Sequence, residues 1–222
     1  GPEELSKETI LDKFKWNEQH SRSIEIRNRF EQNGVIITVY QFGVKNRDLP
    51  VREKSAVIIG QIYRGDSLPQ YLKNDVIDIL KNYIAFHDFT DPIFPHYFHI
   101  LADLAWSSSH HTRILQDNFL QVINRHLQSP RPKNVILSLE IIEHLIIGGN
   151  NYTKQCVKKG IDFEMIKSNQ TQDHNARFLL NEVMKFGGYQ IEEERIQDQD
   201  LEKPIIRENE EKKEDDGNEE KK

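Results

Sequence analysis

Apolar residues recur along this chain three or four positions apart, and short polar turns interrupt them at regular intervals. Four long segments with this helical pattern end in a similar way, at a glycine or a serine. The apolar residues three positions before these ends are Ile62, Leu104, Leu145 and Met184. They are 42, 41 and 39 residues apart, so the chain carries an internal repeat.

A shorter helix and a tight break are expected after each of the first three ends. The breaks lie 43 and 42 residues apart, at Asp75, Asn118 and Gly160. An apolar residue follows each break, and these residue types tolerate the left-handed conformation in which many helices end. The second landmark therefore supports the first.

Proline marks the expected start of three long helices, at Pro50, Pro92 and Pro132, since proline costs no hydrogen bond in a first turn. A unit of about 40 residues with a short, a second and a long third helix is in the range of armadillo and HEAT repeats. Each unit has an apolar face that only stacking can bury. The sequence thus predicts an all-α, armadillo/HEAT-type right-handed α-solenoid of about three to four repeats, with the third helices on the concave side.

Three parts are expected along the chain. Residues 1–33 are predicted to form an N-terminal capping helix, after a Gly-Pro pair typical of a cleaved tag, and residues 34–188 the repeat domain. Residues 34–42 are expected to be the remaining helix of an incomplete first repeat, although their β-branched residues leave a strand open. Residues 189–222 are rich in charge and are predicted to be a disordered acidic tail, either a spacer or an element that attracts a basic partner or inhibits the domain.

The net charge of −6 arises in that tail, which has 14 acidic and 7 basic residues. The rest of the chain is near neutral and has no dense basic cluster, so no nucleic acid is expected as a partner. No apolar run approaches the roughly 18 residues that span a bilayer, so no membrane is expected either. A single cysteine, Cys156, excludes an internal disulfide and favours a cytoplasmic or nuclear location.

Catalytic and metal chemistry find little support. His96, His99 and Asp103 have a spacing that could hold a divalent ion, but a polar helix face is the preferred interpretation. A catalytic pair between Cys156 and the histidines 110–111 is set aside. The sequence has no phosphate loop, nucleophile elbow, zinc-protease motif or dinucleotide fingerprint. We expect a non-enzymatic chain without cofactor or metal.

Polar residues do gather on the predicted third helices. The candidate partner-binding residues are Gln61, His99, Asp103, Glu140, Glu143 and His144. They form a mildly acidic stripe that suits a basic or hydrogen-bond-donating peptide, and a solvated face without a ligand stays open as the alternative. Trp106 is expected in the core. The predicted function is that of a protein–protein interaction module, a scaffold or a subunit of a larger complex, which binds a protein or peptide on its concave surface.

Residues 143–161, EHLIIGGNNYTKQCVKKGI, resemble the turn between two armadillo repeats of the importin-alpha family. Residues 101–127 are similar but looser, and the resemblance covers roughly residues 51–188. It implies the same fold. It also implies an alternative function, that of a divergent nuclear-import adaptor that recognises basic localisation signals.

The functional residues of that family are not carried over. Its members bind localisation peptides with a ladder of Trp and Asn residues, four positions apart on the third helices. The matching pairs here are Val57 and Gln61, His99 and Asp103, Glu140 and His144, and Leu179 and Val183. None of these residues is Trp or Asn, so the usual peptide grip is not expected.

Overall fold

The computed structural model describes residues 24–87, 93–168 and 174–188, all within one unit, Gly1–Ile191. The second unit, Glu192–Lys222, and with it most of the predicted tail, lies outside the described residues. Within the described ranges the chain is helical and contains no strand, as predicted. None of these helices is long and apolar enough to span a bilayer.

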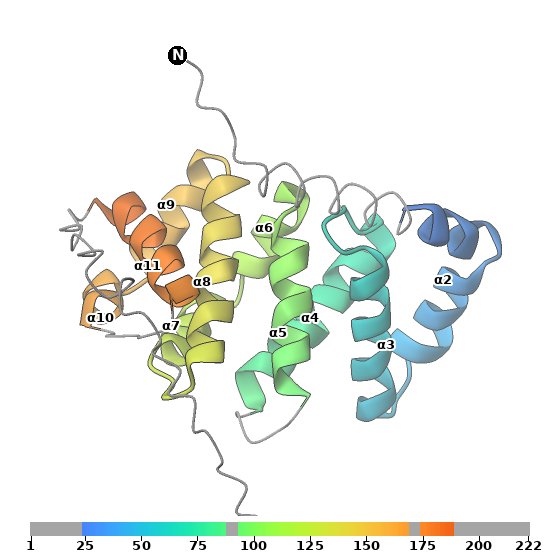
Figure 1. The fold of residues 1–222 in the computed structure, drawn as a ribbon. Coiled ribbons are helices and arrows are strands. Elements are labelled where there is room, and N and C mark those ends of the chain that lie inside the picture. The colour runs from blue at the N-terminus through green and yellow to red at the C-terminus, as the bar shows by residue number, and fades with distance from the viewer. Residues whose placement is uncertain (1–23, 88–92, 169–173, 189–222) are drawn as a thin grey trace, which may run out of the picture. The chain divides into compact units, whose positions relative to one another are not determined.

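The elements follow one another as short and long helices (Figure 1). After the helical residues 24–32 come α2 (Val35–Val39), the π-helix η1 (Tyr40–Val44), α3 (Leu49–Ile62), α4 (Gln70–Phe86), α5 (Phe94–Ala105), α6 (Ser108–Leu115), α7 (Phe119–Leu127), α8 (Pro132–Ile147), α9 (Asn151–Gly160), α10 (Phe163–Ser168) and α11 (His174–Gly187).

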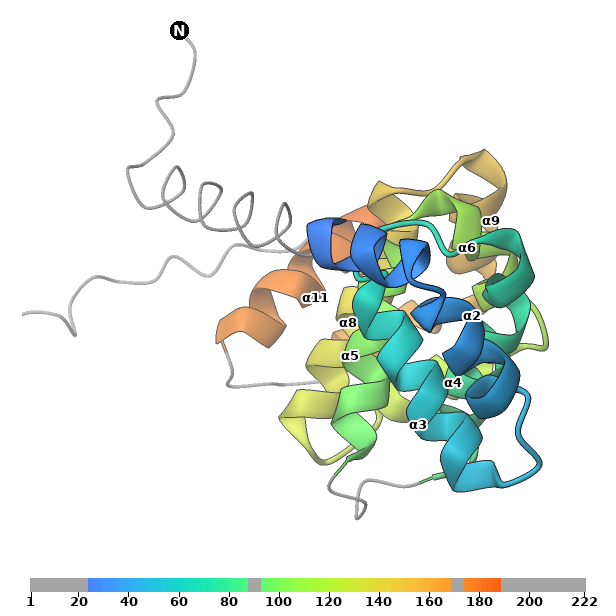
Figure 2. The ribbon, with the colours of Figure 1, turned by 90° about the vertical axis from the view of Figure 1, so that its right-hand side faces the viewer.

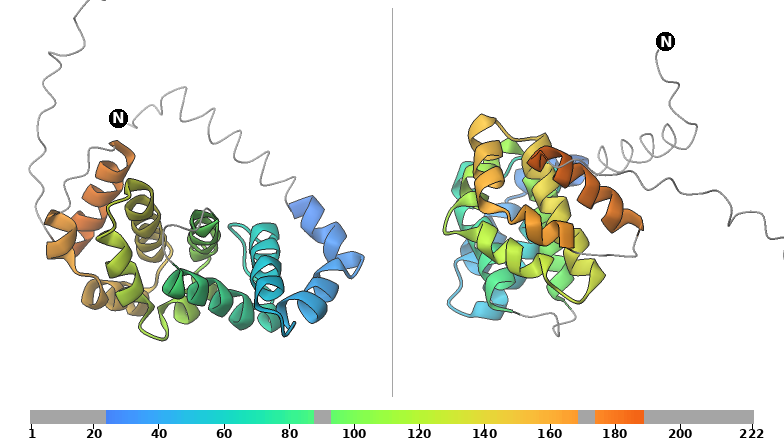
Figure 3. Two further views of the ribbon diagram at one scale, coloured as in Figure 1. Left: turned by 90° about the horizontal axis from the view of Figure 1, so that it is seen from below. Right: turned by 90° about the vertical axis from the view of Figure 1, so that its left-hand side faces the viewer.

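The third helices of successive repeats, α3, α5, α8 and α11, lie side by side in chain order. Viewed from below, they form one row on the inner side of a shallow curve, and the other helices of the repeats form the row behind (Figure 3). Figure 2 looks onto the first end of this stack, with α2 and α3 near the viewer. This is the arrangement of an armadillo-type α-solenoid.

The residues that defined the repeat in the sequence are core residues of the stack. Leu104, Leu145 and Met184 are buried, and Ile62 at the first repeat is half-buried. Side-chain caps help to fix the starts of several helices: the carboxylate of Asp48 accepts from the Val51 N–H at 3.0 Å, and Asn150 and Asp162 cap α9 and α10 in the same way. The repeat period is therefore a packing period.

The predicted breaks have three different outcomes. Asn118 has the left-handed conformation, with φ of 57°, and separates α6 from α7 as expected. The break at Asp75 is wrong: α4 continues through it, because Leu72, Val76 and Leu80 keep the helical spacing without an intervening Gly or Pro. Helix α9 does end at Gly160, but not in a left-handed turn. A Cβ at Gly160 would lie 2.5 Å from Cδ1 of Leu120, so close packing explains this glycine.

Residues 34–42 are helical, which resolves the open choice between helix and strand. Pro50 and Pro132 stand in the first turns of α3 and α8, as predicted, whereas Pro92 lies outside the described residues and Pro95 stands in the first turn of α5. Only residues 24–33 of the predicted capping segment are described.

Candidate functional site

The inner row of helices presents five of the six predicted site residues. Gln61 lies on α3, His99 and Asp103 on α5, and Glu140 and Glu143 on α8. Gln61 and His99 are exposed, and the three carboxylates are half-buried. Together with Arg64 these residues form what we call the third-helix surface.

Asp103 forms an ion pair across two helices. Its carboxylate lies 2.6 Å from Nε of Arg64, which follows the end of α3. Burial raises the pKa of Asp103, and the guanidinium of Arg64 acts in the opposite direction. Arg64 was not predicted as a site residue, although it lies three positions after Gln61 and hence one turn further along the same side.

Among the residues that the structure describes, none forms an ion pair with Glu140 or Glu143 comparable to that of Arg64 with Asp103. Nδ1 of His99 lies 3.9 Å from the Glu140 carboxylate, but burial, followed by the nearby charges of Lys133 and Arg64, lowers the pKa of His99. The imidazole is therefore neutral at pH 7 and leaves Glu140 charged. Burial also raises the pKa of Glu140, with Asp103 and Glu143 adding to the effect.

The pKa of Glu143 is raised as well. Burial is the largest cause that raises its pKa, and the charge of Glu182 on α11 adds to it. Three carboxylates on neighbouring helices thus hold negative charge in surroundings that disfavour it. A cation placed against them would offset that cost.

His144 differs from the prediction, because it is buried rather than part of the exposed stripe. Its Nδ1–H donates to the carbonyl oxygen of Ala102 at 2.7 Å, so it joins α8 to α5. Trp106 shows the reverse: it was expected in the core and is 48% exposed. It is the C-cap of α5, and its ring lies 4.1 Å from the imidazole of His144 at the rim of the surface.

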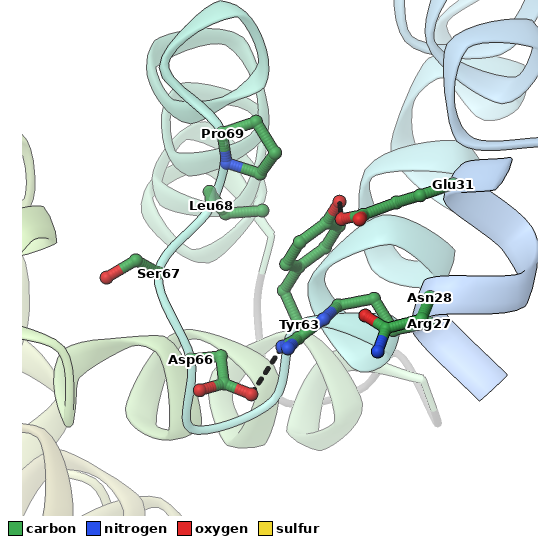
Figure 4. A pocket seen from close by; sticks show the side chains of 8 residues that line it. All are labelled: Arg27, Asn28, Glu31, Tyr63, Asp66, Ser67, Leu68 and Pro69. Atoms are coloured by element: carbon green, nitrogen blue, oxygen red, sulfur yellow. Dashed lines mark hydrogen bonds and ion pairs between the residues drawn. The ribbon is translucent and has the colours of Figure 1, made fainter. Parts of the chain in front are cut away.

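A cavity of about 480 Å³ lies between residues 24–32 and the connection from α3 to α4 (Figure 4). Arg27 forms an ion pair with Asp66, and the hydroxyl of Tyr63 donates to Glu31 at 2.5 Å. Burial and the Glu31 carboxylate raise the pKa of Tyr63 well above its usual range, so it stays protonated. These two contacts fasten the helical residues 24–32 to the connection between α3 and α4.

The histidines 110–111 also serve the fold. His111 donates from Nε2 to the carbonyl oxygen of Ala105, and His110 donates from Nδ1 to that of Leu104, each at 2.7 Å. Both imidazoles thus satisfy carbonyl groups at the C-terminal end of α5. Cys156 lies half-buried on α9, and its thiol raises the pKa of the nearby Tyr152.

No protein-family model matches the sequence, and no curated protein matches it. The solved structures that match the chain include two engineered proteins. One is the crystal structure of an engineered protein, with 12% identity and a TM-score of 0.50 over 68% of this chain and 61% of that chain. The other is a designed armadillo repeat protein, with 9% identity and a TM-score of 0.45 over 73% of this chain and 86% of that chain.

At this identity the likeness to the engineered protein is one of fold alone, and the chain spans only 61% of its length. The resemblance to importin-alpha gains no support from these comparisons. The armadillo-type architecture rests on the chain's own stack of repeats, in which third helices about 40 residues apart pack side by side.

Proposed function

We propose that the chain is a non-enzymatic protein-interaction module that binds an extended, basic segment of a partner protein on its third-helix surface. The observation that carries this proposal is the set of three half-buried carboxylates, Asp103, Glu140 and Glu143, all with raised pKa values. A repeat stack of this kind has a continuous inner surface suited to an elongated ligand. The chain would then act as a scaffold or as a subunit of a larger complex.

The Arg64–Asp103 pair is an example, within the chain, of the contact that we propose for the partner. A guanidinium or ammonium group beside Glu140 and Glu143 would relieve their mutual repulsion and replace the water lost by burial. Neighbouring packed helices lie about 8–10 Å apart. A peptide in the extended polyproline II conformation has three residues per turn and advances about 3.1 Å per residue, so basic residues three positions apart lie on one side and would reach carboxylates on successive helices.

The test is a titration of the full chain with a fluorescent peptide of about 12 residues that carries Lys or Arg at every third position. Fluorescence anisotropy at low salt should give binding that weakens at least about tenfold in the double variant Glu140→Gln and Glu143→Gln. Glu164→Gln, which removes an exposed carboxylate on α10, serves as the matched control and should change nothing. Equal affinities for the wild type and both variants would refute the proposal.

A nuclear-import adaptor would use the same surface. The importin-alpha family, which this sequence resembles, binds such signals with a ladder of Trp and Asn residues. The matching positions here include Gln61, Asp103 and His144, which are neither Trp nor Asn, and His144 is buried. We therefore do not extend the proposal to localisation signals. The basic segment that we propose is defined by its charge and extended form alone.

A further inference from the structure

The side of α3 that faces away from α5 carries an apolar stripe. It runs from Val51 through Ser55 and Ile58 to Ile62, at the spacing of residues on one side of a helix. Gly60 and Arg64, which contact α5, lie on the opposite side. Val51 is 40% exposed and Ile58 48% exposed, so much of the stripe is uncovered.

The positions equivalent to Ile58 in the later third helices are buried. Ile100 of α5 lies 42 residues after Ile58, and Ile141 of α8 lies 41 residues further on. Ile100 is 3% exposed and Ile141 0%. Ile100 approaches α3 so closely that a Cβ at Gly60 would lie 2.4 Å from its Cγ2. Ile58 thus occupies the position that packs against the preceding third helix in the inner repeats. At the first repeat, the described residues include no preceding third helix that covers it.

Two further apolar residues of the first repeat are exposed. Ile37 on α2 is 40% exposed, whereas its neighbour Ile36, which lies 41 residues before the buried Ile77 of α4, is buried. Phe42 on η1 is 71% exposed. We call the exposed side of α3 that carries Val51 and Ile58 the first-repeat face, and α3 lies near the viewer in Figure 2.

The helical residues 24–32 leave this face open. They bond to the other end of α3 and the connection beyond it, through Glu31 to Tyr63 and Arg27 to Asp66. Val51 and Ile58 remain exposed in their presence. A surface of exposed aliphatic and aromatic side chains with this repeat register fits a further helix.

The charge of the surrounding segment indicates which kind of helix fits. Residues 33–54 contain four basic residues, Lys45, Arg47, Arg52 and Lys54, and two acidic ones, Asp48 and Glu53. Lys54 is exposed, and it lies between Val51 and Ile58 in sequence. Lys45 is paired with Asp75, so the positive charge beside Val51 and Ile58 comes from the exposed Lys54, which favours an acidic partner by charge complementarity.

We propose that the first-repeat face binds an acidic, amphipathic α-helix of a partner protein, which lies along α3 as α3 lies along α5. The helix places aliphatic side chains against Val51 and Ile58. Directly opposite Ile58 it has a Gly or Ala, because Gly60 takes this place opposite Ile100 in the contact between α3 and α5. Its acidic residues flank the apolar side and face Lys54. This site is separate from the third-helix surface, and its ligand has the opposite charge.

The probe is a fluorescein-labelled helical peptide of about 18 residues, with Ala, Leu and Ile on one side and Glu elsewhere, compared with a twin that carries the neutral Gln in place of Glu. In anisotropy titrations of the full chain the acidic peptide should bind at least about tenfold more tightly than its twin. Ile58→Glu should weaken its binding about tenfold or more, and Lys54→Glu should reverse the preference between the two peptides.

Ile147→Glu is the matched control, because it changes an exposed isoleucine at the far side of the row, on α8. It should leave the affinity for the acidic peptide unchanged, and circular dichroism should report the same helix content in all variants. The proposal is overturned if the acidic peptide does not bind, if Ile58→Glu has no effect, or if Ile147→Glu weakens binding as much as Ile58→Glu does.

Discussion

The Nζ of Lys81 lies 2.8 Å from the carbonyl oxygen of Gln116, so a lysine of α4 closes the C-terminal end of α6. The same ammonium group donates to the carbonyl oxygen of Arg113 at 3.0 Å and lies 3.3 Å from the carboxylate of Asp117. Lys81 is buried, and burial lowers its pKa. The last carbonyl groups of a helix have no partner within the helix, and here a neighbouring repeat supplies one.

Replacing Lys81 by methionine should therefore destabilise the domain. The variant keeps the length of the side chain but leaves the carbonyl oxygens of Arg113 and Gln116 without this donor. We expect a loss of about 2 kcal/mol in the free energy of unfolding, measured by urea titration followed by circular dichroism. Lys158→Met, at an exposed position on α9, should cost less than about 0.5 kcal/mol. Equal losses in the two variants would contradict the assigned role.

Buried histidines should make the stability depend on pH. Nε2 of His110 accepts from the Leu68 N–H at 2.8 Å while Nδ1–H donates to Leu104, so a second ring proton has no acceptor. Burial lowers the pKa of His110, and likewise that of His126 and His144. A folded pKa below the unfolded value of 6.5 gives stability that is complete above that value and is lost as the pH falls toward the folded pKa.

The free energy of unfolding should thus decline between about pH 6.5 and 5.5, by up to about 1.4 kcal/mol per pH unit for each such group. His110→Gln should reduce this slope, and His96→Gln, at an exposed position on α5, should not. A slope that is unchanged in His110→Gln would exclude His110 as a cause. The range ends near pH 5.5 because the raised pKa values of the carboxylates act in the opposite sense in more acidic solution.

The close approach of Ile100 to Gly60 predicts a strong coupling between the two positions. Gly60→Ala should cost about 1–3 kcal/mol, because the new Cβ would overlap Cγ2 of Ile100. In an Ile100→Ala background the same change should cost clearly less, since the overlapping methyl group is absent. A double-mutant cycle of unfolding free energies measures this difference, and additive losses would argue against the contact.

A lysine-rich nuclear-localisation peptide should bind weakly, with a dissociation constant above about 10 μM, or less than about 7 kcal/mol of binding free energy. The expectation follows from the missing aromatic ladder, since aromatic anchors carry much of the energy at peptide interfaces. Calorimetric titration in physiological salt measures it. Submicromolar binding that is lost in the double variant Asp103→Ala and Glu140→Ala would instead favour the import adaptor.

The sequence predicts the repeat well because the same physical constraint acts at each unit. Leu104 and Leu145 occupy one core position, and such a position requires an apolar residue in every repeat. The break at Asp75 was wrong for a local reason. Its carboxylate accepts from Tyr40 at 2.7 Å and pairs with Lys45, so Asp75 joins two repeats from within a continuous helix. Spacing alone does not distinguish this use of Asp from a helix end.

The surface was harder to predict than the core. Asp103 and Glu140 lie half-buried on α5 and α8, two helices of the inner row, and their role as binding residues stays a prediction. His144 was predicted at the surface and is buried, whereas Trp106 was predicted in the core and is exposed. A histidine is buried here because the Ala102 carbonyl accepts its N–H, and Trp106 is exposed because α5 ends just before it. Both causes lie in contacts between repeats, which a single-helix pattern does not contain.

The continuity of α4 has a consequence for how the stack opens. Its 17 residues contact η1 and α3 in the first repeat, α5 in its own, and α6 and α7 in the next. In a repeat array the rate at which a unit's amide protons exchange with water normally depends on the stability of that unit and of its direct neighbours. A single helix that touches three repeats cannot melt in one without loosening the others, so α4 should hold them as one exchange-protected block. Hydrogen exchange should then proceed from the α10–α11 end inward, with the amides of α4 among the last to exchange.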